Sequence, residues 1–111
     1  MAAYQAQNKK VSSCKCGPDY IDPMFHKEVL GVDSKNLDLF FSSEDELRKE
    51  YAKHAADAEL VITEGVMGYY DGMRLDSVTA SSYDVARTLD IPAVLILPCK
   101  GAALSLSLIH I

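Results

Sequence analysis

Two aspartates, separated by a tyrosine and an isoleucine, stand in the run KCGPDYIDPMFH at residues 15–26. Asp19 and Asp22 are flanked by Pro18 and Pro23, and each proline fixes its own φ angle, so the turn is rigid and holds both carboxylates. Positioned carboxylates suit hydrogen bonding to a substrate amide, general acid–base work or the binding of Mg²⁺. The alternative is structural, with Asp19 in a turn and Asp22 capping the following helix.

Other charged residues and two glycines are candidates for the same site. Lys15, near the end of a strand-like run, is either solvated or aimed into a crevice as a compact charge for a phosphate or an acyl phosphate. Glu64 ends an apolar run, where nucleotide enzymes often place an acid near Mg²⁺. Asp38 is equally consistent with a second metal ligand and a helix cap. Gly65 and Gly68 would allow close approach of a ligand to the backbone, although glycines in a turn need no ligand.

The histidines and cysteines give weaker signals. We expect His26 to pack on its short helix and His54 to lie on the surface of a charged one. The cysteines have neither disulfide-framework spacing nor a histidine at ligand spacing. We therefore expect Cys14, Cys16 and Cys99 to be buried or half-buried free thiols in a reducing cytoplasm.

Length and composition restrict the class of protein. The chain has 111 residues, 49% of them hydrophobic and 24% charged, which suggests one modest globular domain. A net charge of -5 argues against nucleic acid as a partner, because phosphate binding needs a basic surface. The start MAAYQAQNKK has no apolar signal region, and no stretch approaches a membrane-spanning length. We expect a soluble cytoplasmic protein without membrane contact.

Strand patterns alternate with helix patterns along the chain. Two apolar runs without alternation, ELVITEG at residues 59–65 and IPAVLIL at 91–97, predict strands covered on both faces. A third strand, at 11–16, stops at a Gly-Pro pair. Alternating strands and helices indicate an α/β fold with a mainly parallel sheet, in which ligands bind at the carboxyl ends of the strands. The aspartate turn follows such an end.

Two of the helices have clear start signals. Aspartate is common at the N-cap of a helix and proline at its first position, so we expect a helix with Asp22 as N-cap and Pro23 as first residue. This helix should end at Gly31. Ser43 and Glu46 form a capping box for the second. Further helix patterns cover residues 2–8, 78–89 and the start of GAALSL.

Two motifs that would complete a catalytic site are absent from the sequence. There is no phosphate loop of the form G-x-x-x-x-G-K-[ST]. There is also no G-x-S-x-G motif, and Cys99 has no evident histidine partner. The residues alone therefore predict a Mg²⁺–phosphate type of site that lacks its main phosphate loop.

Three segments, KCGPDYIDPMFH, SKNLDLF and ITEGVMGYYDG, resemble in order and spacing the N-terminal domain of the cobyrinic acid a,c-diamide synthases. The resemblance covers residues 1–105 and implies part of a three-layer P-loop fold, like that of dethiobiotin synthetase, that binds ATP, Mg²⁺ and a tetrapyrrole. The family are carbon–nitrogen ligases of cobalamin biosynthesis. ATP phosphorylates the a and c carboxylates of a corrinoid, and ammonia from glutamine, supplied by a C-terminal amidotransferase domain, displaces the phosphate.

The resemblance also implies roles by position. Asp19 and Asp22 would be catalytic, orienting the carboxylate and the incoming ammonia. Tyr20 and Ile21 would complete the substrate-facing turn. Lys15 would contact the substrate and neutralise its acyl phosphate.

A second group of roles concerns the nucleotide. Glu64 would be catalytic and a metal ligand beside the phosphates, with Asp38 as its partner on Mg²⁺. Gly65 and Gly68, together with Lys15, would contact ATP.

Parts of the family pattern fall outside this sequence. We expect the phosphate-loop strand upstream of residue 1, which would make Met1 an internal methionine, and the amidotransferase domain is missing. The ending LSLIHI is similar to a translated sequencing adapter, so residues 106–111 are expected to be non-native. We expect the remaining partial ATP-binding domain, residues 1–105, to be inactive alone.

Two other functions fit the same motifs. One is a nickel-sirohydrochlorin a,c-diamide synthase, an enzyme of the same build acting on a different tetrapyrrole. The other is a small non-catalytic α/β module that binds a tetrapyrrole without an ATPase. The sequence leaves open whether the protein forms a homodimer.

Overall fold

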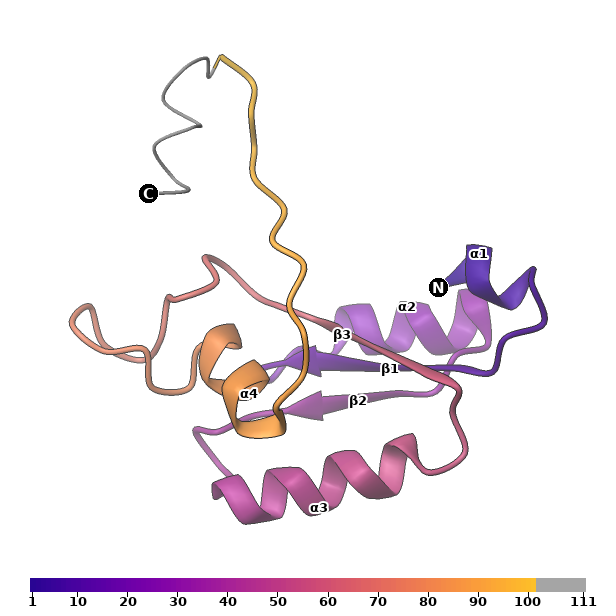
Figure 1. Cartoon of the computed structure of the whole chain (residues 1–111), viewed down its shortest axis with the longest axis horizontal. Helices are drawn as coiled ribbons and strands as arrows, with labels where there is room; N and C mark the ends of the chain where they lie inside the picture. The colour runs from indigo at the N-terminus through magenta and orange to yellow at the C-terminus, as the bar shows by residue number, and fades with distance from the viewer. Residues whose placement is uncertain (102–111) are drawn as a thin grey trace.

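A computed structural model describes residues 1–101 of the chain, and its centre is a sheet of three parallel strands. The strand order is β2-β1-β3, and the strands are β1 (Val11–Cys16), β2 (Ser34–Leu37) and β3 (Leu60–Glu64) (Figure 1). In register, Lys15 of β1 is paired with Asn36 of β2 and with Glu64 of β3. Because all three strands run in one direction, their carboxyl ends meet at one edge of the sheet.

The helices place the sheet in the middle of three layers. They are α1 (Ala2–Gln5), α2 (Ile21–Leu30), α3 (Glu44–Ala55) and α4 (Ser82–Leu89). α2 covers one face, and α3 and α4 cover the other (Figure 1). The predicted α/β fold with a parallel sheet is confirmed. None of the helices within residues 1–101 is long and apolar enough to cross a membrane.

The two faces of β1 differ in chemistry because side chains alternate along a strand. Cys14 and Cys16 face α3 and α4 and belong to the apolar core, which also contains Leu37, Leu47 and Val85. Ser13 and Lys15, which are also buried, point to the α2 side. Burial raises the pKa of the Cys14 thiol to about 12, so this thiol is unreactive at neutral pH. The core and the polar candidates therefore lie on opposite faces of the same strand.

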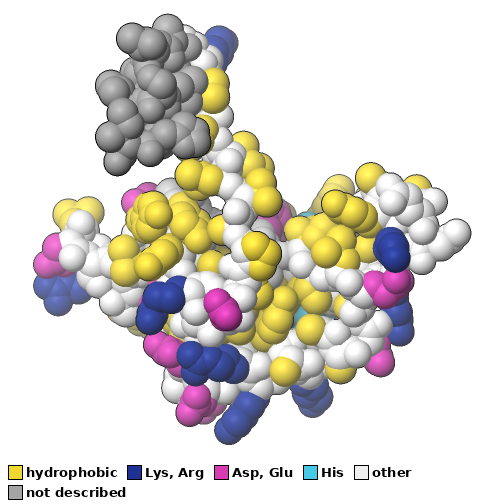
Figure 2. All heavy atoms as spheres, in the orientation of Figure 1, with side chains coloured by type: hydrophobic (Ala, Val, Ile, Leu, Met, Phe, Trp, Pro, Cys, Tyr) yellow, Lys and Arg dark blue, Asp and Glu magenta, His cyan; other side chains and the backbone are white. Residues whose placement is uncertain are grey.

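Residues 91–97 do not form the predicted strand. The segment is extended but unpaired, and Val94 and Ile96 are 92% and 89% exposed. It leaves the body of the molecule after α4 (Figure 1), and hydrophobic side chains lie on the surface along it (Figure 2). β3 is only half-buried for a related reason: within residues 1–101 it pairs with β1 alone and is an edge strand. The prediction that both runs are covered on both faces was wrong.

α2 begins differently from the sequence-based prediction. The helix starts at Ile21, and its N-cap is Tyr20 rather than Asp22. Asp22 does not cap the helix because its carboxylate accepts a 2.6 Å hydrogen bond from Lys15. Asp19 Oδ1 instead accepts from the Ile21 backbone N–H at 2.9 Å. The predicted end at Gly31 is confirmed, since Gly31 adopts the left-handed conformation with φ of 62°.

Two other expectations about single residues were wrong. The His54 side chain is not on the surface: it is 9% exposed, and its Nε2 lies 2.7 Å from Ser12 Oγ and 2.9 Å from the Ser13 carbonyl oxygen. Cys99 is an exposed free thiol rather than a buried one, because the segment that carries it projects from the fold. The predicted helix at GAALSL and the predicted non-native tail at 106–111 lie outside the described residues.

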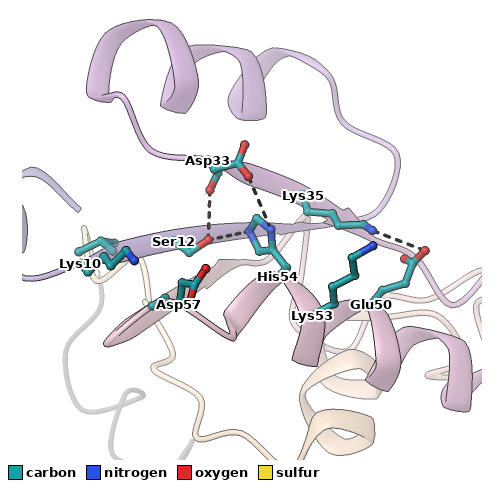
Figure 3. A pocket seen from close by; sticks show the side chains of 10 residues that line it. Lys10, Ser12, Asp33, Lys35, Glu50, Lys53, His54 and Asp57 are labelled. Carbon is teal, nitrogen blue, oxygen red and sulfur yellow. Dashed lines mark hydrogen bonds and ion pairs between the residues drawn. The ribbon is translucent and has the colours of Figure 1, made fainter.

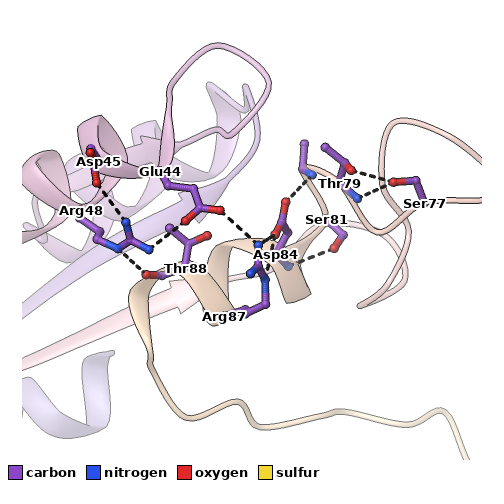
Figure 4. Close-up of polar contacts among 10 residues, drawn as sticks. Glu44, Asp45, Arg48, Ser77, Thr79, Ser81, Asp84, Arg87 and Thr88 are labelled. Carbon is purple, nitrogen blue, oxygen red and sulfur yellow. Dashed lines mark hydrogen bonds and ion pairs between the residues drawn. The ribbon is translucent and has the colours of Figure 1, made fainter.

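A network of charges joins the start of α3 to α4. Glu44 accepts hydrogen bonds from Arg48 at 2.9 Å and from Arg87 at 3.3 Å (Figure 4). Arg48 Nε also donates to the Thr88 carbonyl oxygen, and Arg87 pairs with Asp84 at 2.7 Å. This network fixes α4 against the start of α3.

The predicted capping box of α3 is present. Ser43 Oγ accepts from the Glu46 backbone N–H, and Glu46 Oε2 accepts from the Ser43 backbone N–H at 2.9 Å and from its hydroxyl at 2.7 Å. Hydrogen bonds from Ser43 hold the pKa of the Glu46 carboxyl below its ordinary value of 4.5. The backbone N–H contributes most, and the hydroxyl contributes less. A carboxyl group with a lower pKa in the folded protein than in the unfolded chain stabilises the fold at pH values above its unfolded pKa. This stabilisation is lost as the pH falls through the pKa of the folded state.

Ser43→Ala is therefore expected to lower the free energy of unfolding by about 1 kcal/mol at pH 7, because a helix N-cap is lost. Urea unfolding at several pH values measures this difference. We expect the difference to shrink as the pH falls below 4.5, because protonation of Glu46 removes the charge that strengthens its hydrogen bond from the hydroxyl. Ser42→Ala is the matched control, with little expected change. A difference that stays constant into acid would contradict the role of Glu46.

Candidate functional site

Three carboxylates converge on one buried lysine at the carboxyl edge of the sheet. Lys15 is 5% exposed, and its Nζ lies 2.6 Å from Asp22 Oδ2, 3.3 Å from Glu64 Oε1 and 3.7 Å from Asp19 Oδ2. We call these four residues the Lys15 cluster. The parallel register places Glu64 beside Lys15, and the turn after β1 returns both aspartates to it. The turn needs Gly17, whose φ of 80° is in the left-handed region.

The charges of the Lys15 cluster stabilise one another. Burial alone would lower the pKa of Lys15, but hydrogen bonds from its ammonium to Asp22 and Glu64 outweigh burial and raise that pKa. The same ammonium holds the pKa of Asp22 below its usual value. One ammonium faces three carboxylates, so the cluster has an excess of negative charge. It is therefore suited to a cation or to a group that gives up protons.

His26 also reaches this cluster, which the sequence-based reasoning missed. The prediction that it packs on its helix is confirmed, since it is 7% exposed. In addition, its Nε2 lies 3.7 Å from Glu64 Oε2. The signal was present in the spacing, because His26 follows Asp22 by four residues and shares its face of α2.

Asp38 stands apart from the Lys15 cluster. Its Oδ1 accepts from the Phe40 backbone N–H at 2.8 Å, while its Oδ2 is buried and has no hydrogen-bond partner among the described residues. Asp38 lines a mainly apolar cavity of about 350 Å³ together with Cys16, Phe40, Phe41, Met67 and Met73, among others. Glu64 lies level with Asn36 across β1, and Asp38 comes two residues after Asn36, so the two backbones are at least about 9–10 Å apart. Among residues 1–101, no three His, Cys, Asp or Glu side chains are arranged so that they could hold a metal ion together.

The two candidate glycines lie in a loop that packs tightly on itself. A Cβ at Gly65 would come within 2.9 Å of Ser82 Oγ, and one at Gly68 would collide with the Asp71 carboxylate. The Gly68 N–H donates to that carboxylate at 3.1 Å. The packing of the loop after β3 therefore accounts for both glycines without a ligand.

Tyr20 and Ile21 are open to a binding partner. They are 80% and 75% exposed and stand between the two aspartates of the turn. Large exposed apolar side chains beside a charged cluster suit a ligand with both apolar and ionised parts.

A second polar group lies at the opposite edge of the sheet, in a cavity of about 430 Å³ (Figure 3). Ser12, His54 and Asp33 resemble a nucleophile triad there, with Ser12 Oγ 2.7 Å from His54 Nε2 and Asp33 Oδ2 3.9 Å from His54 Nδ1. The Ser13 carbonyl lies 2.9 Å from the same Nε2 and can only accept a hydrogen bond, so Nε2 carries a proton. It therefore cannot act as a base toward Ser12, and this group is structural.

The fold and the Lys15 cluster define an α/β domain with a charged ligand edge at the carboxyl ends of parallel strands. Curated proteins similar to the chain are cobyrinate a,c-diamide synthases. That of Synechococcus sp. is 42% identical over 109 residues, covering 98% of this chain and 24% of the relative. Those of Gloeobacter violaceus and Clostridium tetani are 41% and 39% identical, each covering 96% of this chain and 24% of the relative.

The chain belongs to the cobyrinate a,c-diamide synthase family, which confirms the resemblance noted in the sequence. It spans about a quarter of the length of these relatives. No protein-family model and no solved structure matches it.

Proposed function

We propose that this chain is part of the ATP-binding domain of an amidoligase that converts the a and c carboxylates of cobyrinate to carboxamides in cobalamin biosynthesis. The observation that supports this most directly is the Lys15 cluster, which lies at the ligand edge of the sheet within the segment shared with the curated relatives. In this proposal, residues 1–105 belong to a cytoplasmic synthetase domain. Glutamine supplies the ammonia through a separate amidotransferase domain.

The aspartate turn would handle the attack of ammonia on the activated carboxylate. The nitrogen forms a bond to the carboxyl carbon, the bond from that carbon to the phosphate oxygen breaks, and one proton leaves the nitrogen. In this proposal, Asp19 and Asp22 would orient the nucleophile and accept that proton. Lys15 balances the negative charge of the phosphate. Tyr20 and Ile21 would contact the macrocycle through their exposed apolar surface.

The family also implies Mg²⁺ and ATP, and the residues present suit the metal. Mg²⁺ binds carboxylate oxygens and retains several waters, so it needs only one or two protein ligands. Asp38 offers a buried oxygen that lacks a partner among residues 1–101, and Glu64 offers a half-exposed carboxylate. When bound, Mg²⁺–ATP supplies the phosphoryl group that activates the substrate. Gly65 and Gly68 would contribute backbone N–H groups to ATP only if their loop opened.

A chimera tests the proposed function. In the Synechococcus chimera, the matching residues of the Synechococcus relative are replaced by the aligned residues of this chain. We expect ATP-dependent conversion of cobyrinate to its a,c-diamide, and a loss of about 100-fold or more in Asp19→Asn and Asp22→Asn. Turnover is followed by phosphate release and by mass spectrometry of the corrinoid.

Other outcomes would identify the alternatives. If nickel-sirohydrochlorin stimulates ATP consumption and cobyrinate does not, the substrate in this proposal is wrong. If cobyrinate binds to the 111-residue chain but the chimera neither hydrolyses ATP nor forms amide, a non-catalytic binding module is the better description. Phe25→Ala, on the exposed side of α2, is a control that should retain most activity.

A further inference from the structure

α2 exposes much of the apolar surface that an ordinary amphipathic surface helix would bury. Its one buried residue is a histidine, His26. Four large apolar side chains of the same helix are more than half exposed: Ile21, Met24, Phe25 and Val29. Burying an imidazole costs free energy unless its nitrogens find partners. The position of His26 therefore calls for an explanation other than hydrophobic burial.

The contacts of His26 fix the direction of its ring. Nδ1 lies 3.1 Å from Ser13 Oγ of β1 and 3.4 Å from Ser34 Oγ of β2. Each hydroxyl can donate to Nδ1, and a neutral ring that accepts at Nδ1 carries its proton on Nε2. Nε2 then faces Glu64 Oε2 at 3.7 Å. In this tautomer, serines on two neighbouring strands would aim an N–H donor at the third strand.

Glu64 is consequently approached from two sides. Lys15 Nζ lies 3.3 Å from Oε1, and His26 Nε2 faces Oε2. Without the histidine, the carboxylate could turn about its last torsion and still keep the lysine contact, because such torsions are broad. With both groups, each oxygen has its own partner.

We infer that His26 is a positioning residue: oriented by Ser13 and Ser34, it holds the Glu64 carboxylate in the orientation that the site requires. The 3.7 Å separation is long for a hydrogen bond, and such contacts commonly tighten when a ligand binds. The catalytic consequence rests on the proposed function, in which Glu64 stands beside the metal and the phosphates. The contact between His26 and Glu64 is independent of that function.

Histidine side-chain ¹⁵N spectra of the 111-residue chain test the contact directly, at about pH 9 where imidazoles are neutral. We expect His26 to be the Nε2–H tautomer. Glu64→Gln should shift the Nε2 resonance more than Nδ1, and Ser13→Ala should shift Nδ1 more than Nε2. His54, at the opposite edge of the sheet, is the internal control and should not respond to Glu64→Gln.

The same spectra can overturn the inference. An Nδ1–H tautomer of His26 would remove the donor from the Glu64 side. An Nε2 resonance that is unchanged in Glu64→Gln, with the Ser13→Ala effect present, would show that His26 serves only to attach α2 to the sheet. Assignment follows from the signal that disappears in His26→Asn.

Two replacements of His26 in the Synechococcus chimera, His26→Gln and His26→Asn, test the consequence for turnover. A glutamine at this position can present an N–H where Nε2 stands, whereas the shorter asparagine can reach only the position of Nδ1. We expect His26→Asn to lower kcat about 10-fold or more at little-changed KM for cobyrinate, and His26→Gln to retain most of kcat. Equal losses in both variants would contradict the positioning role. If the unsubstituted chimera is inactive, the proposed function fails, and the spectra still decide the His26–Glu64 contact.

Discussion

Lys15→Met is expected to reduce amide formation by the Synechococcus chimera by at least about 100-fold, the loss typical of a removed charge-stabilising group. Methionine keeps the apolar stem of lysine and removes only the ammonium. Asp22 and Glu64 then lose the hydrogen bonds that hold them, and the cluster becomes a set of like charges. The loss should appear mainly in kcat, because the positive charge is needed most where phosphate leaves.

The same substitution should destabilise the isolated chain only modestly, because the three carboxylates are partly exposed and their charges are screened by solvent. The pKa of Lys15 is raised, so its contribution is complete below the unfolded value of 10.5 and is lost as the pH rises through the folded value. The pKa of Asp22 is lowered, so its contribution is present above 3.8 and is lost as the pH falls further. Urea unfolding should show a difference that is largest between these limits.

Lys35→Met is the matched control for this prediction. Lys35 also lies on a strand and pairs with a carboxylate, Glu50 at 3.5 Å, but its side chain is 40% exposed and lies near the opposite edge of the sheet. We expect its turnover to be close to that of the unsubstituted chimera. A Lys15→Met chimera that keeps normal kcat would show that the ammonium is a structural counter-ion and has no role in the chemistry.

The elements with local signals could be predicted from the sequence. The capping box at Ser43 and Glu46, the helix end at Gly31 and the strand before Gly17 each depend on neighbouring residues, and all three are present. The order of strand and helix patterns likewise sufficed for a parallel sheet. Such features have signals in residues that are adjacent in sequence, so they can be read without knowing the contacts between distant segments.

Features that depend on contacts distant in sequence could not be predicted. Asp22 has the residue type of a helix cap, but the lysine seven positions earlier binds its carboxylate. His54 lies on a charged helix, yet its side chain is only 9% exposed and contacts the Ser13 carbonyl, 41 positions away. IPAVLIL has the composition of a buried strand, but composition does not supply a neighbouring strand, and within residues 1–101 β3 pairs only with β1.

The convergence of the candidate site was predicted only in part. The sequence placed Lys15 near the end of one strand, Asp19 and Asp22 after that strand, and Glu64 at the end of another. A parallel sheet brings such ends together. It could not give the order β2-β1-β3, which puts β1 between Asp38 and Glu64. The separation of these two residues follows from that order alone.

Leu47→Ala should have the largest effect on stability, lowering the free energy of unfolding by about 3 kcal/mol. Leu47 is 1% exposed, and the core around it is small, with two of its five members being cysteines. Domains of this size are stabilised by roughly 5–15 kcal/mol in total, so the variant should lose a large share of its stability and unfold at a much lower urea concentration. Urea unfolding and amide hydrogen exchange measure the loss.

Phe41→Ala is the control, because Phe41 is 74% exposed and its truncation should change stability by less than about 0.5 kcal/mol. In Leu47→Ala, hydrogen exchange should accelerate most in β1. Cys14 and Cys16, which pack in the same core as Leu47, alternate along that strand with Ser13 and Lys15. A loosened core would therefore also loosen the residues that hold His26 and the three carboxylates. If β1 stayed protected while α3 exchanged freely, the Lys15 cluster would be held by the sheet alone, independent of the apolar core behind it.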